Sequence, residues 1–423
     1  MKVTGIIVEY NPFHKGHQYH INKARAITKS DYIIAVMSGH FTQRGTPAVC
    51  DKWNRTKMAL ESGVDLLIEL PLCFSIRSAE YFAQSAMQLL AKTNLVDDVV
   101  FGSEHGDIDI LKNIASLLLE NNQYYEKRLK KYLKEGSGFP AARKNALLDL
   151  VKLKSNTNYW SQHNIFAILN GSNNILGIEY LKAKQRFNLN LEVDTIKRIG
   201  PNYYSEEKTD HYLSATAIRN SLNNNELDSV KEKIPAITYK ILKKEIADNK
   251  IPIKKENLSL ILLAKIRKLS IEQLVKILDI NQDLAVRIKN AANNSGNYKQ
   301  LMASINTRSY TKTRFQRILL NILFNINKDI INNHDYKGPS YIRILGFNQK
   351  GKDLLSKMSE KSSLPIIINP SEYLNNLTFS SEDLLKNSLS LDIYATDVYT
   401  LLYQNASYRK ANLDFTKKVI KSF

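Results

Sequence analysis

The sequence of 423 residues predicts an α/β fold: a parallel sheet in the first half, followed by a mainly helical C-terminal region with a small α/β element. Three observations carry this prediction. Short β-branched runs alternate with amphipathic stretches up to residue 103, which is typical of a parallel sheet wrapped by helices. Apolar residues then recur at helical spacing between residues 224 and 331. A strand, helix and strand pattern returns at residues 341–370.

The first half is expected to contain strands and helices in strict alternation. The first strand is "KVTGIIV" and the helix after it is "HQYHINKARAI", whose apolar residues recur every three or four positions. The later strands are expected at residues 31–37, 64–70 and 97–103, and the helices between them at 51–63 and 78–92. Mainly helical sequence to about residue 150, a helix at 173–187, a strand at 191–200 and a helix from about 214 complete this half.

The chain is long enough for two or three domains. We expect boundaries near residues 222 and 335, which gives domains at 1–222, 223–335 and 336–423. The second of these is helical and basic. The third begins with "YIRILGF", "QKGKDLLSKMSEK" and "LPIIINP", expected as strand, helix and strand, and continues as helices to the end.

Composition narrows the class of protein. Hydrophobic residues make up 43% and charged residues 24%, which is typical of a globular enzyme. No apolar run reaches the roughly 18 residues of a membrane helix, and the first apolar stretch ends at Glu9, too early for a signal peptide. Cys50 and Cys73 cannot form a disulfide framework and are expected to be packing residues. The sequence therefore predicts a cytoplasmic protein without a membrane partner, and it indicates no oligomeric state.

The positive charge is concentrated in the second half. The formal net charge is +19; residues 1–220 hold 28 basic and 22 acidic side chains, and residues 221–423 hold 32 and 19. Such a field attracts polyanions, so nucleic acid is the leading partner and an acidic membrane surface the second. The alternative is that a Lys- and Asn-rich composition raises the charge without any such partner.

The stretch "EYNPFHKGH", Glu9 to His17, follows the first strand and has the features of a phosphate site. Asn11 and Pro12 make a turn, and Gly16 permits close approach of the backbone. A helix beginning near His17 offers free N–H groups. His14 and His17 can reach the same side and donate N–H groups to phosphate oxygens. Loop histidines are often bystanders, and a zinc pair is a further alternative, although zinc requires more ligands than these two.

These residues resemble the His-x-Gly-His motif of the nucleotidyltransferase superfamily. A later stretch, "SATAIRN", resembles its second signature, with Ser214, Thr216 and Arg219 in place and Ala215 where a serine is usual. Helix-capping hydroxyls and an arginine one turn later suit a second phosphate clamp. The resemblance implies a Rossmann-like nucleotidyltransferase domain that binds ATP over residues 1–222.

Further stretches resemble one family more closely. "MSGHFTQRGTPAVCDKWNR", "VDLLIELP", "FGSEHGD", "SNNILGIEY" and "TIKRIG" follow in the order and spacing of the bacterial tRNA(Met) cytidine acetate ligases, and "TRSYTKTRFQRILL" and "YIRILGFNQKG" extend the match. The resemblance implies that ATP and acetate form an acetyl-adenylate, which acetylates N4 of the wobble cytidine of elongator tRNA(Met) and releases AMP and pyrophosphate. Mg²⁺ is expected to accompany the phosphates, and the sequence assigns no metal-binding residue and does not fix whether a protein group holds the metal.

The same resemblance assigns the site residues. His14 and His17 are the expected catalytic pair. The ATP site is expected to comprise Ile7, Val8, Glu9, Tyr10, Asn11, Pro12, Phe13, His14, Lys15, Gly16, His17, Gln18, Tyr19, His20, Gly102, Asn173, Arg198, Ser214, Thr216 and Arg219. From the residues alone, Asn173 could equally cap the helix that follows it. The tRNA is expected to bind the helical domain at 223–335, through Arg308, Lys312, Arg314 and Arg317, which alternate with aromatic residues.

The sequence is compatible with two roles for one loop and with other functions for the chain. The loop "SGHFTQRGTP" either binds the acceptor, through Gln43 and Arg44, or acts as a lid. The chain could also be an adenylyltransferase or acid:amine ligase for a small molecule, or an RNA-binding sensor without turnover. The basic second half favours an enzyme that acts on RNA, because a small acceptor would not require it.

Overall fold

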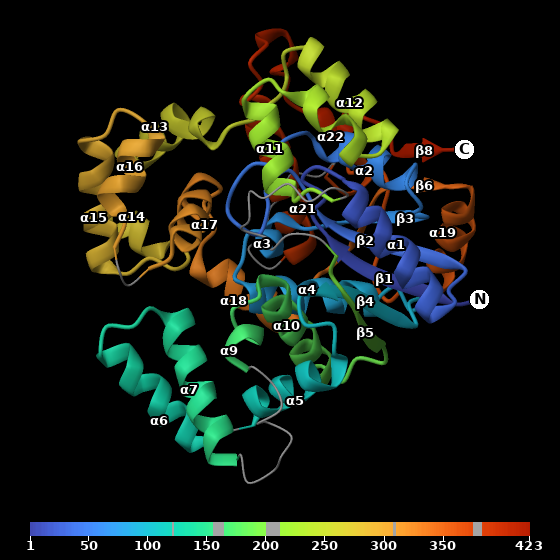
Figure 1. Cartoon of the computed structure of the whole chain (residues 1–423). Helices are drawn as coiled ribbons and strands as arrows, with labels where there is room; N and C mark the ends of the chain where they lie inside the picture. Colours follow the sequence, from blue (N-terminus) through green and yellow to red (C-terminus); the bar gives the residue numbers. More distant parts are fainter. Residues whose placement is uncertain (121, 155–164, 200–211, 308–309, 375–382) are drawn as a thin grey trace.

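A computed structural model describes residues 1–120, 122–154, 165–199, 212–307, 310–374 and 383–423. Its strands form a single sheet in the order β5-β4-β1-β2-β3-β6-β7, and β8 pairs with β6 (Figure 1). The strands are β1 Val3–Val8, β2 Tyr32–Ser38, β3 Leu66–Leu70, β4 Asp98–Ser103, β5 Glu192–Lys197, β6 Ile342–Asn348, β7 Ile366–Ile367 and β8 Ile420–Ser422.

The helices of the first half connect these strands. They are α1 Lys15–Thr28, α2 Lys52–Leu60, α3 Leu72–Ser75, α4 Ala79–Ala91, α5 Ile108–Leu119, α6 Gln123–Lys134, α7 Phe139–Lys154, α9 Ile165–Ile168, α10 Ser172–Arg186 and α11 Ala215–Asn223. Right-handed crossovers place α1 and α2 on one face of the sheet and α4 and α10 on the other. In agreement, α4 packs against α10.

The second half consists mainly of helices. Those between residues 259 and 323 form the helical lobe beside the sheet, and the later ones return to the sheet (Figure 1). The helices of this half are α12 Ala236–Ala247, α13 Ser259–Lys268, α14 Ile271–Lys276, α15 Gln282–Asn293, α16 Tyr298–Ile305, α17 Lys312–Leu323, α18 Lys328–Lys337, α19 Gln349–Lys361, α20 Ser371–Leu374, α21 Leu384–Thr400 and α22 Leu413–Thr416. Short 3₁₀ helices lie at Leu227–Lys233, Lys255–Leu258 and Ala406–Tyr408. Within the described ranges, no helix combines the length and apolar character needed to cross a bilayer.

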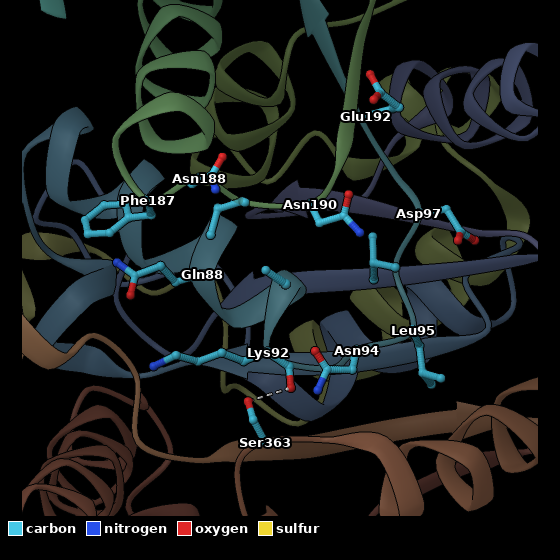
Figure 2. A pocket seen from close by; sticks show the side chains of 13 residues that line it. Gln88, Lys92, Asn94, Leu95, Asp97, Phe187, Asn188, Asn190, Glu192 and Ser363 are labelled. Carbon is cyan, nitrogen blue, oxygen red and sulfur yellow. Dashed lines mark hydrogen bonds between the residues drawn. The ribbon is translucent and has the colours of Figure 1, made fainter.

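The order of the strands produces a crevice at one edge of the sheet. The chain runs from β1 to β2 and β3 in one direction, and then to β4 and β5 on the other side of β1. All pairings among these five strands are parallel. The reversal makes a crevice at the carboxyl ends of β1 and β4, where open α/β sheets bind ligands. The amino ends of β4 and β5 carry a separate depression, and Figure 2 shows the side chains that line it.

The predicted alternation of strands and helices is confirmed, with three corrections. The first helix begins at Lys15, two residues before the predicted start, because His14 caps it. The strand at 342–348 lies antiparallel to β3, so the small α/β element extends the main sheet. The expectation of helices alone after residue 370 is wrong, because the chain ends in β8, which pairs with β6. The division at residues 222 and 335 stays a prediction, although its first and third parts share this sheet.

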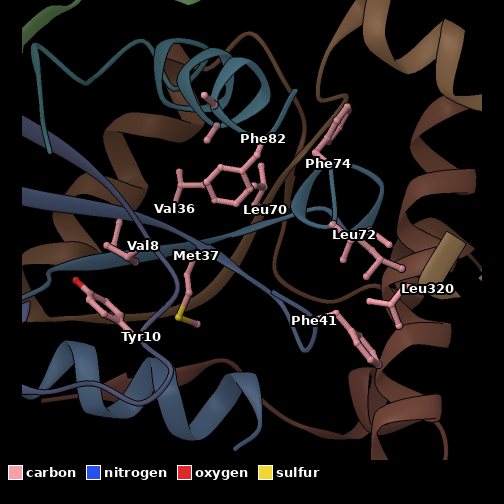
Figure 3. Packing of buried hydrophobic residues seen from close by; sticks show 14 of the residues in the cluster. Val8, Tyr10, Val36, Met37, Phe41, Leu70, Leu72, Phe74, Phe82 and Leu320 are labelled. Carbon is pink, nitrogen blue, oxygen red and sulfur yellow. The ribbon is translucent and has the colours of Figure 1, made fainter. Parts of the chain in front are cut away.

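A continuous apolar core joins the sheet to the helical lobe (Figure 3). Phe41, in the loop after β2, packs edge-on against Phe324, which follows α17, with ring centroids 5.0 Å apart. Leu320 of α17 lies in the same cluster as Val8 and Met37 of the sheet (Figure 3). The two cysteines, Cys50 and Cys73, are buried and unpaired, as predicted. This shared core holds α17 in place relative to the end of β1.

A buried ionic cluster ties the C-terminal segment to the sheet. Lys52 Nζ at the start of α2 lies 2.8 Å from Glu69 Oε2 of β3 and 2.9 Å from Asp414 Oδ1 of α22. Arg343 Nη2 of β6 lies 2.7 Å from the same Asp414 oxygen. Buried charges are tolerated only when they are paired in this way. The cluster therefore occupies Lys52 fully, and its ammonium group is not available to a ligand.

Candidate active site

His14 and His17 are locked together at the start of α1. His14 is the N-cap, and its Nδ1 accepts a hydrogen bond from Gly16 N at 3.1 Å. His17 reaches back, and its Nδ1 accepts one from His14 N at 3.3 Å. The reciprocal arrangement is a capping box in which two imidazoles replace the usual hydroxyl and carboxylate. The two rings consequently stack, with centroids 3.6 Å apart.

Burial determines the charge of the two rings, and the backbone contacts determine which ring nitrogen carries the proton. Burial, followed by the Arg198 and Arg219 charges, lowers the pKa of His14 to about 3. Burial and then His14 hold the pKa of His17 well below its usual value. Both rings are therefore neutral at pH 7. Because Nδ1 of each ring is an acceptor, the single proton of each ring sits on Nε2. The pair presents two N–H donors, as required for binding phosphate oxygens.

The second motif braces the first. Ser214 caps α11, its side chain accepting a hydrogen bond from Ala217 N at 3.1 Å, as the sequence predicts. Arg219, one turn further on, donates from Nη1 to Asn11 O at 2.7 Å and from Nη2 to Thr216 Oγ1 at 3.0 Å. Arg219 thus stabilises the turn at Asn11, which leads into the two histidines. Thr216 acts on Arg219 and does not line the cavity described below.

The end of β4 supplies the opposite wall of the crevice. A Cβ on Gly102 would lie 3.3 Å from Arg198 Cγ, so glycine allows the arginine side chain to cross the strand end. Glu104, just beyond β4, accepts hydrogen bonds from Asn173 N at 3.1 Å, Asn173 Nδ2 at 2.7 Å and Asn174 N at 2.8 Å. Glu104 therefore anchors the start of α10. The alternative in which Asn173 caps this helix is wrong, because Gly171 is the N-cap.

A cavity of about 550 Å³ joins these parts at the carboxyl ends of β1 and β4. It brings together most of the predicted residues: Ile7, Val8, Glu9, Tyr10, Asn11, His14, Gly16, His17, Tyr19, His20, Gly102, Asn173, Arg198, Ser214 and Arg219. Pro12, Phe13, Lys15 and Gln18 are not part of its lining. Phe13 is buried in the core, and Lys15 Nζ donates to Glu232 O at 2.6 Å instead.

The helical lobe closes one side of the cavity. Arg317, predicted to bind RNA, lines the cavity together with Thr311 and Thr313. Lys312 and Arg314 lie outside the lining, and Arg308 lies outside the described residues. The sequence did not reveal Thr311 and Thr313 as lining residues, because only the tertiary fold brings α17 to this end of the sheet.

The loop after β2 bridges the sheet and the lobe. Gln43 N donates to Glu9 Oε1 at 2.7 Å, and Gln43 Nε2 donates to Arg77 O at 3.1 Å. The backbone of Gly45 packs directly on α17, where an added Cβ would lie 2.5 Å from Arg317 N. The loop is thus held on both sides, and it supplies Gln43 and Arg44 to the cavity lining.

The depression in Figure 2 differs from this cavity in chemistry. It has a volume of about 660 Å³ and lies at the amino ends of the strands, near Asp97 and Glu192. It carries amide side chains such as Asn94 and Asn190, but its lining holds no histidine or arginine. In the described part of the chain, no group of three or more His, Cys, Asp or Glu side chains could hold a metal ion. Among these residues, His14 and His17 therefore belong to no such group.

The fold and the site together define a nucleotidyl transferase. A parallel sheet carries its ligand cavity at the strand reversal, and a His-x-Gly-His helix start presents neutral N–H donors to it. The model of the family described as HIGH Nucleotidyl Transferase matches residues 1–414.

Comparison with individual proteins narrows the assignment. The chain is 47% identical to a tRNA(Met) cytidine acetate ligase of Halothermothrix orenii over 100% of both chains. It is 43% identical to the Acetivibrio thermocellus protein of the same name, over 99% of this chain and 100% of the other. A crystal structure of Thermotoga maritima TmcAL bound with alpha-thio ATP superposes with a TM-score of 0.91 at 38% identity, covering 100% of this chain and 99% of that one. The chain therefore belongs to the tRNA(Met) cytidine acetate ligase family.

Proposed function

We propose that the protein activates acetate with ATP and acetylates N4 of the wobble cytidine of elongator tRNA(Met). The observation that carries this proposal is the stacked pair of His14 and His17, which lines a cavity at the strand reversal with both Nδ1 atoms bonded to backbone N–H groups. The family supports the same reaction, since its members bear the name of that ligase. The reaction takes place in the cytoplasm, where ATP and tRNA are available.

The cavity has an end suited to phosphates. His14, His17, Arg198 and Arg219 line the cavity near the start of α1, where the N–H groups of His14 and Gly16 are already bonded to the two imidazoles. The acetate oxygen attacks the α-phosphorus, the bond to pyrophosphate breaks, and acetyl-adenylate forms. The histidine N–H groups and the arginines stabilise the charge that grows on the phosphoryl oxygens. Because the two rings are neutral, they donate hydrogen bonds without transferring a proton.

Mg²⁺ fits this site only as a partner of the substrate. Of the described residues that line the cavity, Glu9 alone carries a carboxylate, and its Oε1 already accepts a hydrogen bond from Gln43 N. The described part of the lining therefore offers no acidic ligand set. When bound, Mg²⁺ would neutralise charge on the phosphate oxygens of ATP. The side chains of the chain would orient the nucleotide around it.

The second step requires RNA at the mouth of the same cavity. The cytidine N4 attacks the acetyl carbonyl, AMP leaves, and the amine loses a proton. Lys312 and Arg314 at the start of α17 are the proposed phosphate contacts, and Arg314 Cζ lies 4.3 Å from the centre of the Tyr310 ring. Arg317 reaches from the same helix into the cavity wall, where it would contact the incoming nucleotide.

The decisive experiment incubates the protein with ATP, acetate and unmodified bulk tRNA, followed by mass spectrometry of the nucleosides. A new N4-acetylcytidine signal that requires both ATP and acetate is the expected result. Pyrophosphate release with another carboxylic acid, and no acetylated nucleoside, would indicate a small-molecule ligase. Absence of any turnover would contradict the proposal and favour a nucleotide sensor.

A further inference from the structure

The hairpin of α6 and α7, residues 123–154, is a basic arm without a role in the chemistry described above. Its first helix, α6, exposes four lysines, Lys127, Lys130, Lys131 and Lys134. Lys131 lies 3.7 Å from Glu135, but both side chains are more than half exposed, so this pair neutralises little charge. The arm therefore offers positive charge to a polyanion.

The arm is braced internally and is joined to α10 by an ion pair. Arg128 and Tyr132 of α6 both bind the Asp149 carboxylate of α7, with Tyr132 OH 2.7 Å from Asp149 Oδ2. Arg143 Nη2 of α7 lies 2.6 Å from Oε1 of Glu179, a buried residue of α10. These pairs orient the arm relative to α10, whose start lines the cavity.

The tip of the arm meets the cavity. Phe139, the first residue of α7, is 50% exposed, and the next residue, Pro140, lines the cavity. An aromatic ring exposed to this extent beside a cavity offers a face on which a base can stack. Thr311 and Thr313 of the helical lobe line the same cavity, so the arm and the lobe both contribute to its wall. Figure 1 shows both on the same side of the sheet.

We propose that the basic arm binds the RNA substrate, with Phe139 stacked on an unpaired base at the cavity mouth and the α6 lysines on the adjacent phosphates. This inference rests on the proposed function. The reacting cytidine must leave its stack to reach the cavity, and unstacked bases are typically held on aromatic side chains. Lysines along one helix can bind the phosphate backbone of RNA whatever its base sequence. The arm thus positions the RNA, while the helical lobe holds it from the other side.

Substitutions at Phe139 test the stacking. Phe139→Leu keeps apolar bulk but removes the ring, and it should weaken binding of an anticodon stem-loop RNA by about tenfold or more. Phe139→Trp should retain wild-type binding. Leu153→Ala is the matched control, because Leu153 is 62% exposed near the far end of the same helix. Equal binding by Phe139→Leu and the control would overturn the stacking role.

Neutralising the lysines tests the charge. The triple change of Lys130, Lys131 and Lys134 to Gln should reduce the slope of log affinity against log salt by about 0.7 per lysine. The control triple change, at Lys352, Lys357 and Lys361, lies on α19 on the opposite side of the molecule (Figure 1). Equal slopes for the two triple variants would overturn the proposal.

Two further readouts separate this inference from the proposed function. The affinity for alpha-thio ATP, measured calorimetrically, should be the same in every arm variant, because none of the changed residues lines the cavity. If the wild-type protein binds the stem-loop through the arm but yields no N4-acetylcytidine, the proposed function fails and the arm inference stands. If the arm variants lose binding to phosphatidylglycerol vesicles while RNA binding is unchanged, the arm is a membrane surface and the inference fails.

Discussion

The rings of His14 and His17 lie face to face with their centroids 3.6 Å apart, and the Nδ1 atom of each accepts a backbone N–H. Each imidazole therefore has two separate tasks. Its Nδ1 accepts a backbone N–H at the start of the helix, which leaves its Nε2 as the donor in a ring that lines the cavity. The two tasks can be separated by substitution, because Asn places an oxygen near the position of Nδ1 and Gln places an amide near that of Nε2.

His17→Asn should keep the fold and lose the reaction. The Asn oxygen can accept the hydrogen bond from His14 N, so the melting temperature should stay within a few degrees of wild type. Loss of the Nε2 donor should reduce acetate-dependent pyrophosphate release by about two to three orders of magnitude, the usual cost of removing one such donor. His17→Gln, which keeps a donor there, should retain more activity than His17→Asn. The reverse order, or unchanged release in His17→Asn, would contradict the proposed role of Nε2.

Gly45→Ala should displace the loop after β2. Gly45 has a φ of +74°, and a Cβ would lie 2.5 Å from Arg317 N and 2.6 Å from Gln316 C. The matched control is Gly136→Ala, since Gly136 also has a positive φ, +86°, but nothing lies within 4 Å of its added Cβ. Both variants carry backbone strain, and only Gly45→Ala adds a clash.

The clash predicts a larger loss for Gly45→Ala in denaturant titrations. Its free energy of unfolding should fall by at least about 1 kcal/mol more than that of Gly136→Ala. Acetylation should also fall, because Gln43 and Arg44 move with the loop. Equal stability losses in the two variants would show that the loop yields easily, as a lid would.

The sequence alone predicts where the strands lie in the chain better than it predicts how they pair in the sheet. Periodicity locates β1 to β5 within a few residues, because each is a short apolar run between helices. It cannot predict that β6 pairs antiparallel with β3, since that contact joins residues far apart in the chain. β8 was missed because "VIKSF" is too short for a period to be visible.

In the candidate site, too, motif residues are predictable from the sequence and residues placed by tertiary contacts are not. The motif residues His14, His17 and Arg219 share one cavity, as the motif spacing predicts. Glu104, which anchors Asn173, gave no local signal, because its role depends on the approach of α10 to the end of β4. The charged neighbours of Arg317 predict a contact with RNA, and only tertiary packing reveals that this arginine lines the cavity.

Asp414→Asn should destabilise the protein strongly. Asp414 and Lys52 have fully buried side chains, and Arg343 is 4% exposed. Removing one carboxylate leaves two buried cations with Glu69 as their remaining anion, which typically costs about 3 to 5 kcal/mol. The control is Glu192→Gln, because Glu192 is 80% exposed where it meets Lys184, and its loss should cost under about 0.5 kcal/mol. Similar unfolding midpoints in urea for the two variants would contradict the prediction.

Stability should depend on pH through buried histidines. Burial lowers the pKa of His14 to about 3 and those of His20 and His334 to about 4. In the unfolded chain these side chains titrate near 6.5. Between about pH 3 or 4 and pH 6.5 the unfolded state therefore binds more protons than the folded state. The free energy of unfolding should fall as the pH drops below 6.5, by up to about 1.4 kcal/mol per pH unit for each group.

Urea titrations at pH 7.5, 6.5, 5.5 and 4.5 measure this dependence. His334→Gln provides the comparison, because His334 is buried beside Ser388 and does not line the cavity. The variant differs from wild type in overall stability, so the informative quantity is the slope between pH 6.5 and 4.5. Removing one titrating group should make that slope shallower by up to about 1.4 kcal/mol per pH unit. An identical slope would mean that His334 keeps its proton in the folded state, contrary to its buried position between α18 and α21.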